Sequence, residues 1–375
     1  MWPMSEVIEQ ALPVPVRMDA DERYTGRGVT VAFLDSGFYA HKDLTEPTNR
    51  ILAYHSIFPE FSSLQKPDVA SWHGMMTSVV AAGNGHLSDG LYRSIAPEAN
   101  VVLVKIGKTG RIPESNIETG LRWVFANRKK YDIRIVNISA GGDFEQSYLN
   151  NSLCQLVEEV VKAGMTVVCA VGNAGLSPGH PVLPPASAPS SIAVGGLDDQ
   201  NPLDRARRGM YRSSYGPTID GLQKPEVIAP GIWVAAPILP QTPTAIEARL
   251  YADLDDAADE DLRSIIVAHK GVDKDLDEAY DLNLSLLRQL ITIKLRAGNV
   301  INQDYKFVDG TSFSAPIVSS IIACMLEANP KLTPQQVKRI LIDTAERVAG
   351  VEVERQGWGV VVPRKAVESA LRLRA

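Results

Sequence analysis

The chain has 375 residues, a formal net charge of −6 and 45% hydrophobic residues, which is enough for a large buried core. The mild acidity, together with the lack of any basic run of five or more residues, excludes a typical nucleic-acid-binding protein, and we expect no nucleic acid partner. No apolar stretch approaches the roughly 20 residues of a membrane span, so we expect no membrane partner either.

The first residues and the cysteines favour a cytoplasmic protein. The opening sequence MWPMSE lacks the basic segment and following apolar segment of a secretory signal. The three cysteines, Cys154, Cys169 and Cys324, lie inside apolar runs, and their odd number fits reduced core residues. We therefore expect a cytoplasmic location. A secreted mature form stays open, because a secreted protein can also lack disulfides.

Short apolar runs alternate with helical patterns along the chain. Runs rich in β-branched residues lie at 29–34, 101–106, 133–138, 166–171 and 192–194. Helical patterns lie among them at 74–82, 115–131 and 147–163. Nearly continuous apolar strands that alternate with helices predict a sheet covered on both faces. We expect an α/β fold, a three-layer doubly wound and mainly parallel sheet with a helical insertion.

Polar residues follow several of these runs, and the carboxyl ends of parallel strands are where such sheets bind ligands. Asp35 ends the first run, His73 opens a helical pattern and Asn173 follows the run at 166–171. Ser312 lies in DGTSFSAP, directly before an apolar helical pattern at 317–326. Backbone N–H groups at a helix start point outward and stabilise an oxyanion beside a serine nucleophile. Each residue alone fits an ordinary turn or helix cap, but the four together are improbable by chance.

These segments resemble the subtilisin-like serine proteases, the subtilases. The three catalytic blocks occur in that family's order: VAFLDSG with Asp35, HG with His73, and GTSFSAP with Ser312. Supporting blocks are NISAGG at 137–142, AVGN at 170–173, SSYGP at 213–217, KPEVIAPG at 224–231 and GWG at 357–359. The likeness covers residues 28–371 except for one insertion. It implies a subtilisin-like peptidase domain over residues 28–375, interrupted by a helical insertion at 241–305.

The resemblance implies a serine endopeptidase that hydrolyses peptide bonds through an acyl-enzyme. Ser312 would be the nucleophile, His73 the general base and acid, and Asp35 the group that orients and stabilises the imidazole. Asn173 would donate its amide to the oxyanion together with the backbone N–H of Ser312. This chemistry requires no cofactor.

The resemblance also implies where a peptide binds. An extended substrate would pair with Ser139, Ala140, Gly141 and Gly142. The pocket for the residue before the scissile bond would be flanked by Ala140, Ala170, Val171 and Gly172. The small side chains in these segments predict a roomy, mainly apolar pocket.

The block around His73 departs from the family. MMTS follows His73-Gly74 where the family usually has Thr-His-Val-Ala, so a common second histidine is missing. We expect this change to alter packing more than chemistry. Trp72 stands where a smaller residue is common. It either shades the cleft or packs on the sheet as a partly buried aromatic residue.

A structural calcium ion is an open expectation. Residues 41–44, HKDL, resemble the family segment whose aspartate ligates calcium, but the partner loop at 83–90 is longer than usual and different in sequence. Calcium takes six to eight oxygen ligands. The sequence offers three candidates, Asp43, Asn84 and Asp89.

Residues 241–305 are the largest departure, and they are too many for a structureless loop. Residues 244–267 are acidic with a helical pattern, and residues 273–295 carry apolar residues at helical spacing. The second half of the latter segment is apolar nearly all round, which predicts a fully buried helix, because of Leu282, Leu286, Leu290 and Ile293. Two interpretations stay open: a hairpin packed on its own domain, or a subdomain that mediates homo-oligomerisation or caps the cleft.

Residues 1–27 form an N-terminal extension that is too short for the pro-domain of secreted subtilases. We expect either a mature form or a member that folds without a pro-domain. The run LPVPV at 12–16 predicts extended chain. It would be an ordinary tethered strand, or an inhibitory segment across the active site as in intracellular subtilisins.

Two alternatives to an active endopeptidase remain. One is a catalytically silent scaffold that binds peptides, although the presence of all four catalytic side chains argues against it. The other is a processing protease that acts within a complex, with residues 241–305 as its docking surface.

Overall fold

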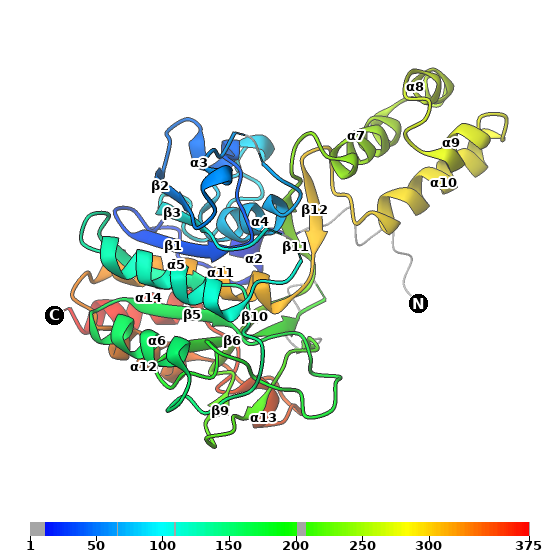
Figure 1. Ribbon diagram of the computed structural model, residues 1–375. Helices are drawn as coiled ribbons and strands as arrows, with labels where there is room; N and C mark the ends of the chain where they lie inside the picture. Colours follow the sequence, from blue (N-terminus) through cyan, green and yellow to red (C-terminus); the bar gives the residue numbers. More distant parts are fainter. Residues whose placement is uncertain (1–11, 66, 109, 201–207, 375) are drawn as a thin grey trace. The chain divides into compact units, whose positions relative to one another are not determined.

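The structure is a computed structural model that describes residues 12–65, 67–108, 110–200 and 208–374 (Figure 1). It divides into two compact units. The large unit comprises Leu12–Val234 and residues 309–374, and the helical unit comprises Ala235–Val308. Residues 1–11 of the predicted N-terminal extension lie outside the described residues.

The large unit is built on a sheet of eight strands, ordered β10-β6-β5-β4-β1-β3-β2, with β7 paired to β6. Neighbouring strands along this order are parallel, whereas β7 runs antiparallel to β6. This arrangement confirms the expected mainly parallel sheet. The strands are β1 (Thr30–Asp35), β2 (Ile51–Ser56), β3 (Asn100–Lys105), β4 (Ile133–Ile138), β5 (Thr166–Ala170), β6 (Ile192–Asp198), β7 (Gly209–Met210) and β10 (Val227–Pro230).

Helices cover both faces of this sheet. On one face lie α5 (Glu114–Asn127) and α6 (Ser152–Lys162), packed on inward-facing residues such as Leu34, Val104 and Ile138. On the other face lie α4 (Ser71–Ala82), α11 (Thr311–Ala328) and α14 (Pro363–Arg372), with α12 (Pro334–Thr344) packed against α14. Each parallel crossover places a helix between strands, as the alternating pattern of the sequence predicts.

Helix α11 is the central helix of the large unit. It contacts α4, α14 and the strands β4, β5, β6 and β10. By length and composition it is the described helix that could cross a membrane, but 89% of that window is buried inside the protein. Its apolar character is therefore explained by its place in the core.

Short elements complete the large unit. They are α2 (Val14–Arg17), α3 (Lys42–Thr45), the 3₁₀ turns η1 (Pro59–Phe61) and η2 (His86–Ser88), the paired strands β8 (Gly216–Pro217) and β9 (Gln223–Lys224), and α13 (Val353–Gln356).

The prediction of extended chain at residues 12–16 is wrong. Pro15 stands at the second position of the single helical turn α2, where a missing N–H costs no hydrogen bond. The turn ends at Arg17, whose side chain is buried by contacts distant in sequence. The prolines at 13 and 15 could not predict these long-range contacts of Arg17.

The helical unit begins and ends on a pair of strands, β11 (Val234–Pro237) and β12 (Tyr305–Val308). Four helices lie between them: α7 (Pro243–Asp256), α8 (Leu262–Ala268), α9 (Lys274–Glu278) and α10 (Leu284–Ala297). Both predicted helical segments are thus divided into two. The unit has its own core, which includes Leu254, Leu262, Leu276, Leu287 and Ile291.

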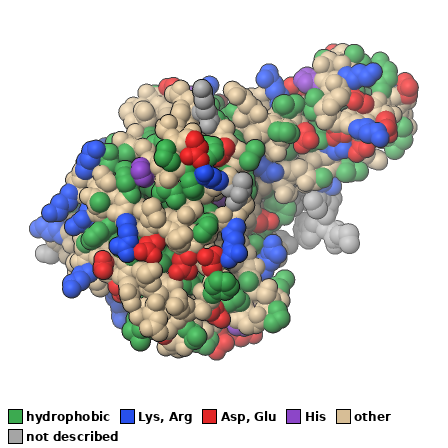
Figure 2. Space-filling view, viewed as in Figure 1, with side chains coloured by type: hydrophobic (Ala, Val, Ile, Leu, Met, Phe, Trp, Pro, Cys, Tyr) green, Lys and Arg blue, Asp and Glu red, His purple; other side chains and the backbone are tan. Residues whose placement is uncertain are grey.

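The prediction that the last helix of this unit is buried all round is wrong. Leu287, Ile291 and Leu295 face the core, but Leu286 and Ile293 are 45% and 58% exposed. The unit is only a few helices thick, so its neighbours cover one stripe of α10 and leave the opposite stripe exposed. Figure 2 shows hydrophobic side chains among charged ones on the visible face of this unit.

Candidate active site

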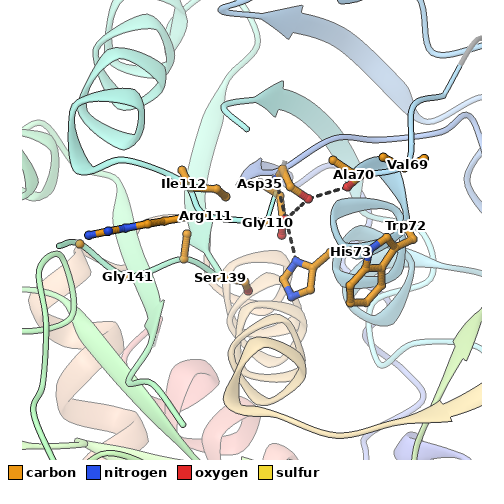
Figure 3. A pocket seen from close by; sticks show the side chains of 13 residues that line it. Asp35, Val69, Ala70, Trp72, His73, Gly110, Arg111, Ile112, Ser139 and Gly141 are labelled. Carbon is orange, nitrogen blue, oxygen red and sulfur yellow. Dashed lines mark hydrogen bonds and ion pairs between the residues drawn. The ribbon is translucent and has the colours of Figure 1, made fainter. Parts of the chain in front are cut away.

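Asp35 and His73 are in direct contact where β1 ends (Figure 3). Nδ1 of His73 lies 2.7 Å from Oδ1 of Asp35, and Asp35 is 1% exposed. The same carboxylate accepts the backbone N–H of Ser36 over 2.7 Å and the hydroxyl of Thr77 over 3.0 Å. These donors fix the carboxylate, so it can hold the imidazole in one orientation.

Gly74 allows α4 to approach β1 closely. A Cβ atom at this position would lie 2.2 Å from the carbonyl oxygen of Gly37 and 2.9 Å from Cβ of Asp35. Any side chain would therefore move His73 away from Asp35. The helix begins at Ser71, three residues before the predicted range 74–82, so His73 lies within its first turn. The block that follows Gly74 and departs from the family belongs to the core, since Met75 and Met76 are buried.

The pKa of His73 reflects two opposing effects. Burial lowers the pKa, while the negative charge of Asp35 and the hydrogen bond to it raise the pKa by more in sum. The net result is a His73 pKa above its ordinary value. The pair therefore favours the imidazolium, the form that a general base becomes during reaction.

Ser312 is the second residue of α11, as its sequence context predicts. Pro316 lacks an N–H, so the carbonyl oxygen of Ser312 has no helical donor four residues on. The hydroxyl of Ser139 donates to that oxygen instead, over 3.0 Å. This bond joins the end of β4 to the first turn of α11.

The Ser312 hydroxyl is not hydrogen-bonded to His73 in this structure. It donates to the carbonyl oxygen of Ser139 over 3.5 Å, and among the described residues no hydrogen bond joins Ser312 to His73. The two are neighbours nevertheless, since the ring of His73 lies 5.7 Å from that of Phe313. Hydrogen bonds of this kind are often long without substrate.

Asn173 follows β5 and lies beside the start of α11. Its Oδ1 accepts the backbone N–H of Thr311 and the hydroxyl of Thr311, both over 3.0 Å. The Thr311 hydroxyl in turn accepts the N–H of Gly172 over 3.3 Å. Because the amide oxygen is engaged in this way, Nδ2 is the donor that Asn173 presents to a ligand.

A pocket of about 200 Å³ lies beside Ser312 and Asn173. Seven of the predicted substrate and oxyanion residues line it, namely Ser139, Ala140, Gly141, Ala170, Val171, Gly172 and Asn173. Its remaining walls include Pro181, Leu183 and Ser214. The lining is mostly apolar and small, which suits an uncharged side chain.

A larger cavity of about 450 Å³ is lined by Asp35, His73 and residues 139–142 (Figure 3). Val69, Trp72, Arg111 and Ile112 contribute to its walls. Trp72 is half-exposed and its ring meets that of His73 edge-on, with centroids 5.2 Å apart. This placement favours the interpretation in which Trp72 shades the cleft. Gly142 also lines this cavity, but its N–H already donates to the carbonyl oxygen of Pro184.

Comparison with known proteins shows the family of this chain. A model of the subtilase family matches residues 26–359. The chain belongs to the subtilase family. Serine protease AprX of Bacillus subtilis is 29% identical over 353 residues, which cover 92% of this chain and 67% of AprX. Subtilisin E of Bacillus subtilis is 30% identical over 212 residues, which cover 56% of this subtilase and 48% of subtilisin E. The chain thus spans two thirds of AprX and about half of subtilisin E.

Two solved structures share the fold of this subtilase. The CspB protease of Clostridium perfringens has a TM-score of 0.68 at 15% identity, with 98% of both chains covered. Fervidolysin from Fervidobacterium pennivorans, a keratinolytic enzyme related to subtilisin, has a TM-score of 0.60 at 18% identity, with 95% of this chain and 45% of that chain covered. At these identities the likeness shows the fold alone.

Several residues of this site were missed by sequence reasoning. Lys105 is a buried lysine that ends β3; its Nζ donates to the carbonyl oxygen of Ser36 and to Asp68 Oδ2 over 2.6 and 2.8 Å. Asp68 also accepts the hydroxyl of Ser71 at the start of α4. Lys105 thereby links the segment after Asp35 to the helix that carries His73. A charged residue ending an apolar strand was the available signal.

The candidate calcium ligands are only partly brought together. The N–H of Asn84 donates to the carbonyl oxygen of Asp43 over 3.0 Å, and Asp43 Oδ1 accepts the N–H of Leu87. Asn84 Oδ1 accepts the N–H of His86. No hydrogen bond joins Asp89 to Asp43 or Asn84, and the described part of the chain holds no group of three or more His, Cys, Asp or Glu residues suited to a metal. Calcium at this loop stays a prediction, and a fall in thermal midpoint with a chelator would support it.

Proposed function

We propose that this subtilase is a serine endopeptidase that cleaves proteins or peptides through an acyl-enzyme at Ser312. The observation that carries the proposal is the 2.7 Å contact between His73 Nδ1 and the buried Asp35, with Ser312 at the start of α11. Asp35 keeps a proton on Nδ1, so the lone pair of Nε2 is available as a base.

The reaction follows from these roles. As the Ser312 oxygen bonds to the peptide carbonyl carbon, its proton passes to His73 Nε2 and the carbonyl oxygen takes the negative charge. Nε2 then returns that proton to the leaving nitrogen, the carbon–nitrogen bond breaks and the amine departs. In deacylation water is the nucleophile and Ser312 is the leaving group. The water proton passes to Nε2 as the water oxygen attacks the acyl carbon, and Nε2 then returns the proton to the Ser312 oxygen as its bond to that carbon breaks.

The oxyanion would be received by two donors that already point outward. One is Nδ2 of Asn173, whose orientation follows from the bonds of Oδ1 to Thr311. The other is the backbone N–H of Ser312, in the first turn of α11, where N–H groups lack intrahelical acceptors. Both donors adjoin the 200 Å³ pocket.

The substrate would bind as an extended strand along residues 139–141, with the side chain before the scissile bond in the smaller pocket. Ala140, Ala170 and Leu183 give that pocket apolar walls. We infer a preference for uncharged apolar side chains at this position. A panel of peptides varied at this position tests the inference, and a strict requirement for an acidic or basic residue would contradict it.

The function itself is tested by hydrolysis of an unfolded protein substrate and of fluorogenic peptides. The protein should cleave both, and Ser312→Ala should abolish cleavage. Ser320→Ala is a matched control, because Ser320 lies on the same helix and its hydroxyl donates to Ile317 within it. An inactive wild-type protein that binds peptides would support the silent scaffold instead.

We infer a cytoplasmic location, supported by three buried free thiols; cell fractionation tests it.

We also propose that the exposed stripe of α10 mediates homo-oligomerisation, supported by the exposure of Leu286 and Ile293. Sedimentation should then show a smaller species for the variant Leu286→Glu with Ile293→Lys. An unchanged mass would contradict the oligomer.

A further inference from the structure

The N-terminal turn α2 ends at Arg17, whose guanidinium is buried in the large unit. The side chain of Arg17 is 1% exposed, and it forms a two-pronged ion pair with Asp199, which follows β6. Nε donates to Oδ2 over 3.0 Å and Nη2 donates to Oδ1 over 2.6 Å. A paired arrangement of this kind fixes both side chains, so Arg17 holds a defined position in the core.

The same guanidinium donates to two successive backbone carbonyls. Nη1 donates to Trp233 O over 2.6 Å, and Nη2 donates to Ile232 O over 2.9 Å. Trp233 adopts a φ of 57°, which is a strained conformation for a bulky residue. Such a conformation persists only where its surroundings enforce it. Arg17 supplies part of that enforcement, because it binds the Trp233 carbonyl directly.

The other side of Trp233 is bound by the loop that carries the nucleophile. The N–H of Trp233 donates to Oδ1 of Asp309 over 3.0 Å, and the N–H of Gly310 donates to the carbonyl oxygen of Gly231 over 2.8 Å. Residues 309 and 310 directly precede Thr311 and Ser312. The segment 231–233 is therefore held between Arg17 on one side and the nucleophile loop on the other.

Arg17 lies in a group of acidic side chains. Asp198, Asp199 and Asp309 all lie near enough to interact electrostatically. Burial raises the pKa of the Asp198 carboxyl, Asp199 and Asp309 raise it further, and Arg17 lowers it. Arg17 is a cation that offsets this acidic group. Its removal would break the buried ion pair with Asp199, which is destabilising.

We propose that Arg17 is a positioning residue for catalysis: by clamping the strained backbone at Trp233, it holds the loop 309–312 and thus sets the place of Ser312. The inference rests on the proposed function of Ser312. It also opposes the alternative in which the N-terminal segment is inhibitory, because the described part of that segment would support activity. Displacement of a reacting group by about 1 Å can cost on the order of 100-fold in rate.

The test compares Arg17→Met with wild-type protein in steady-state peptide hydrolysis. We expect kcat to fall at least about tenfold while KM changes less than about twofold, because the bonds of Arg17 go to Asp199 and residues 232–233 and not to the substrate strand at 139–141. Arg50→Met is the matched control. Arg50 is also buried and also donates to backbone carbonyls, in its case the three of Asp43, Ala82 and Ala99. Among the described residues, its hydrogen bonds include none to residues 231–233 or 309–312. Its kcat should stay within about twofold of wild type at temperatures where it is folded.

A second variant tests the route through Trp233. Glycine adopts a positive φ without steric cost. Trp233→Gly introduced into Arg17→Met should therefore recover at least about fivefold in kcat, although it restores no charge and no hydrogen bond to Arg17. A merely structural role for Arg17 predicts no such recovery, because Trp233→Gly restores none of the contacts that Arg17 makes.

The outcomes are distinguishable. If wild-type protein does not hydrolyse peptides, the proposed function fails. If wild-type protein is active and Arg17→Met keeps its kcat when folded, as judged by near-ultraviolet circular dichroism, the positioning role fails. An equal loss of kcat in Arg50→Met would also overturn it, since any buried arginine would then have the same effect. Absence of recovery with Trp233→Gly would contradict the route through the Trp233 backbone.

Discussion

Thr311 fixes the orientation of the Asn173 side chain, because its backbone N–H and its hydroxyl both lie 3.0 Å from Asn173 Oδ1. A backbone N–H can only donate, so the atom that faces it must be the amide oxygen. The amide nitrogen then serves as a donor beside Ser312. The residue directly before the proposed nucleophile thus orients the proposed oxyanion donor.

The first prediction concerns this pair. Asn173→Ala should lower kcat by on the order of 10²–10³, as loss of an oxyanion donor does, with little change in KM. Thr311→Val keeps the N–H and loses only the hydroxyl, so it should cost about fivefold, the equivalent of about 1 kcal/mol. Steady-state kinetics on one peptide measures both. A greater loss in Thr311→Val than in Asn173→Ala would contradict the orientation argument.

The second prediction is a pH profile. Burial lowers the pKa of His73, but Asp35 raises it by more, so the net pKa is above the ordinary value of about 6.5. Because attack requires neutral His73, kcat/KM should rise with pH through an apparent pKa above that value. Asp35→Asn should lower the rate by on the order of 10⁴ and move the acid limb to lower pH, since the effect of burial remains. An acid limb that does not move would show that Asp35 does not set the pKa.

The same pair makes a prediction for stability. A raised pKa in the folded state contributes to the free energy of unfolding fully below the unfolded pKa of about 6.5. This contribution is lost as the pH rises through the folded pKa of His73. Urea titrations of wild type and His73→Ala should therefore differ more at pH 5 than at pH 9. Equal differences at both pH values would argue against the ion pair.

A further prediction concerns the cysteines. All three are buried and free, and burial raises the pKa of Cys154 to about 11 and the pKa values of Cys169 and Cys324 above their ordinary range. Since the thiolate is the reactive form, the folded protein should not react with a disulfide reagent at pH 8. Three thiols should react after denaturation. Rapid labelling of the folded protein would contradict this burial.

The helical unit offers a matched pair of core and surface leucines. Leu287 is fully buried in its core, and Leu286 beside it is 45% exposed. Leu287→Ala should lower the free energy of unfolding of this unit by about 2–5 kcal/mol, and Leu286→Ala by less than about 1 kcal/mol. Denaturant unfolding followed by circular dichroism measures both. The measurement uses protein dilute enough to be monomeric, so that no second copy covers the stripe of α10. Similar losses would then contradict the placement of Leu286 on the exposed side of α10.

Much of the site could be predicted because its residues stand at the ends of regular elements. Asp35 ends a strand, Asn173 follows one and Ser312 starts a helix, so the sheet topology places all three at one edge. The pocket walls Pro181 and Leu183 could not be predicted, since they lie in an irregular segment whose path depends on tertiary contacts. Arg17 was missed for the same reason, because its partners are more than 180 residues away.

The error at α10 has a different cause. Helical periodicity shows which residues are apolar, but not how many sides of a helix have neighbours. Leu286 and Ile293 belong to a small unit in which one side of α10 is uncovered. Their burial could be predicted only by assuming a thicker core than residues 235–308 can form.

Covalent labelling with a fluorophosphonate tests the central claim most directly, because the reagent reacts with an activated serine. Peptide mapping by mass spectrometry should place a single adduct on Ser312 in the folded wild-type protein. Labelling should be lost in Ser312→Ala and slowed by orders of magnitude in His73→Ala, while Ser320→Ala should label like wild type. An unlabelled wild-type protein, or an adduct that persists in Ser312→Ala, would contradict the assignment of Ser312 as the nucleophile.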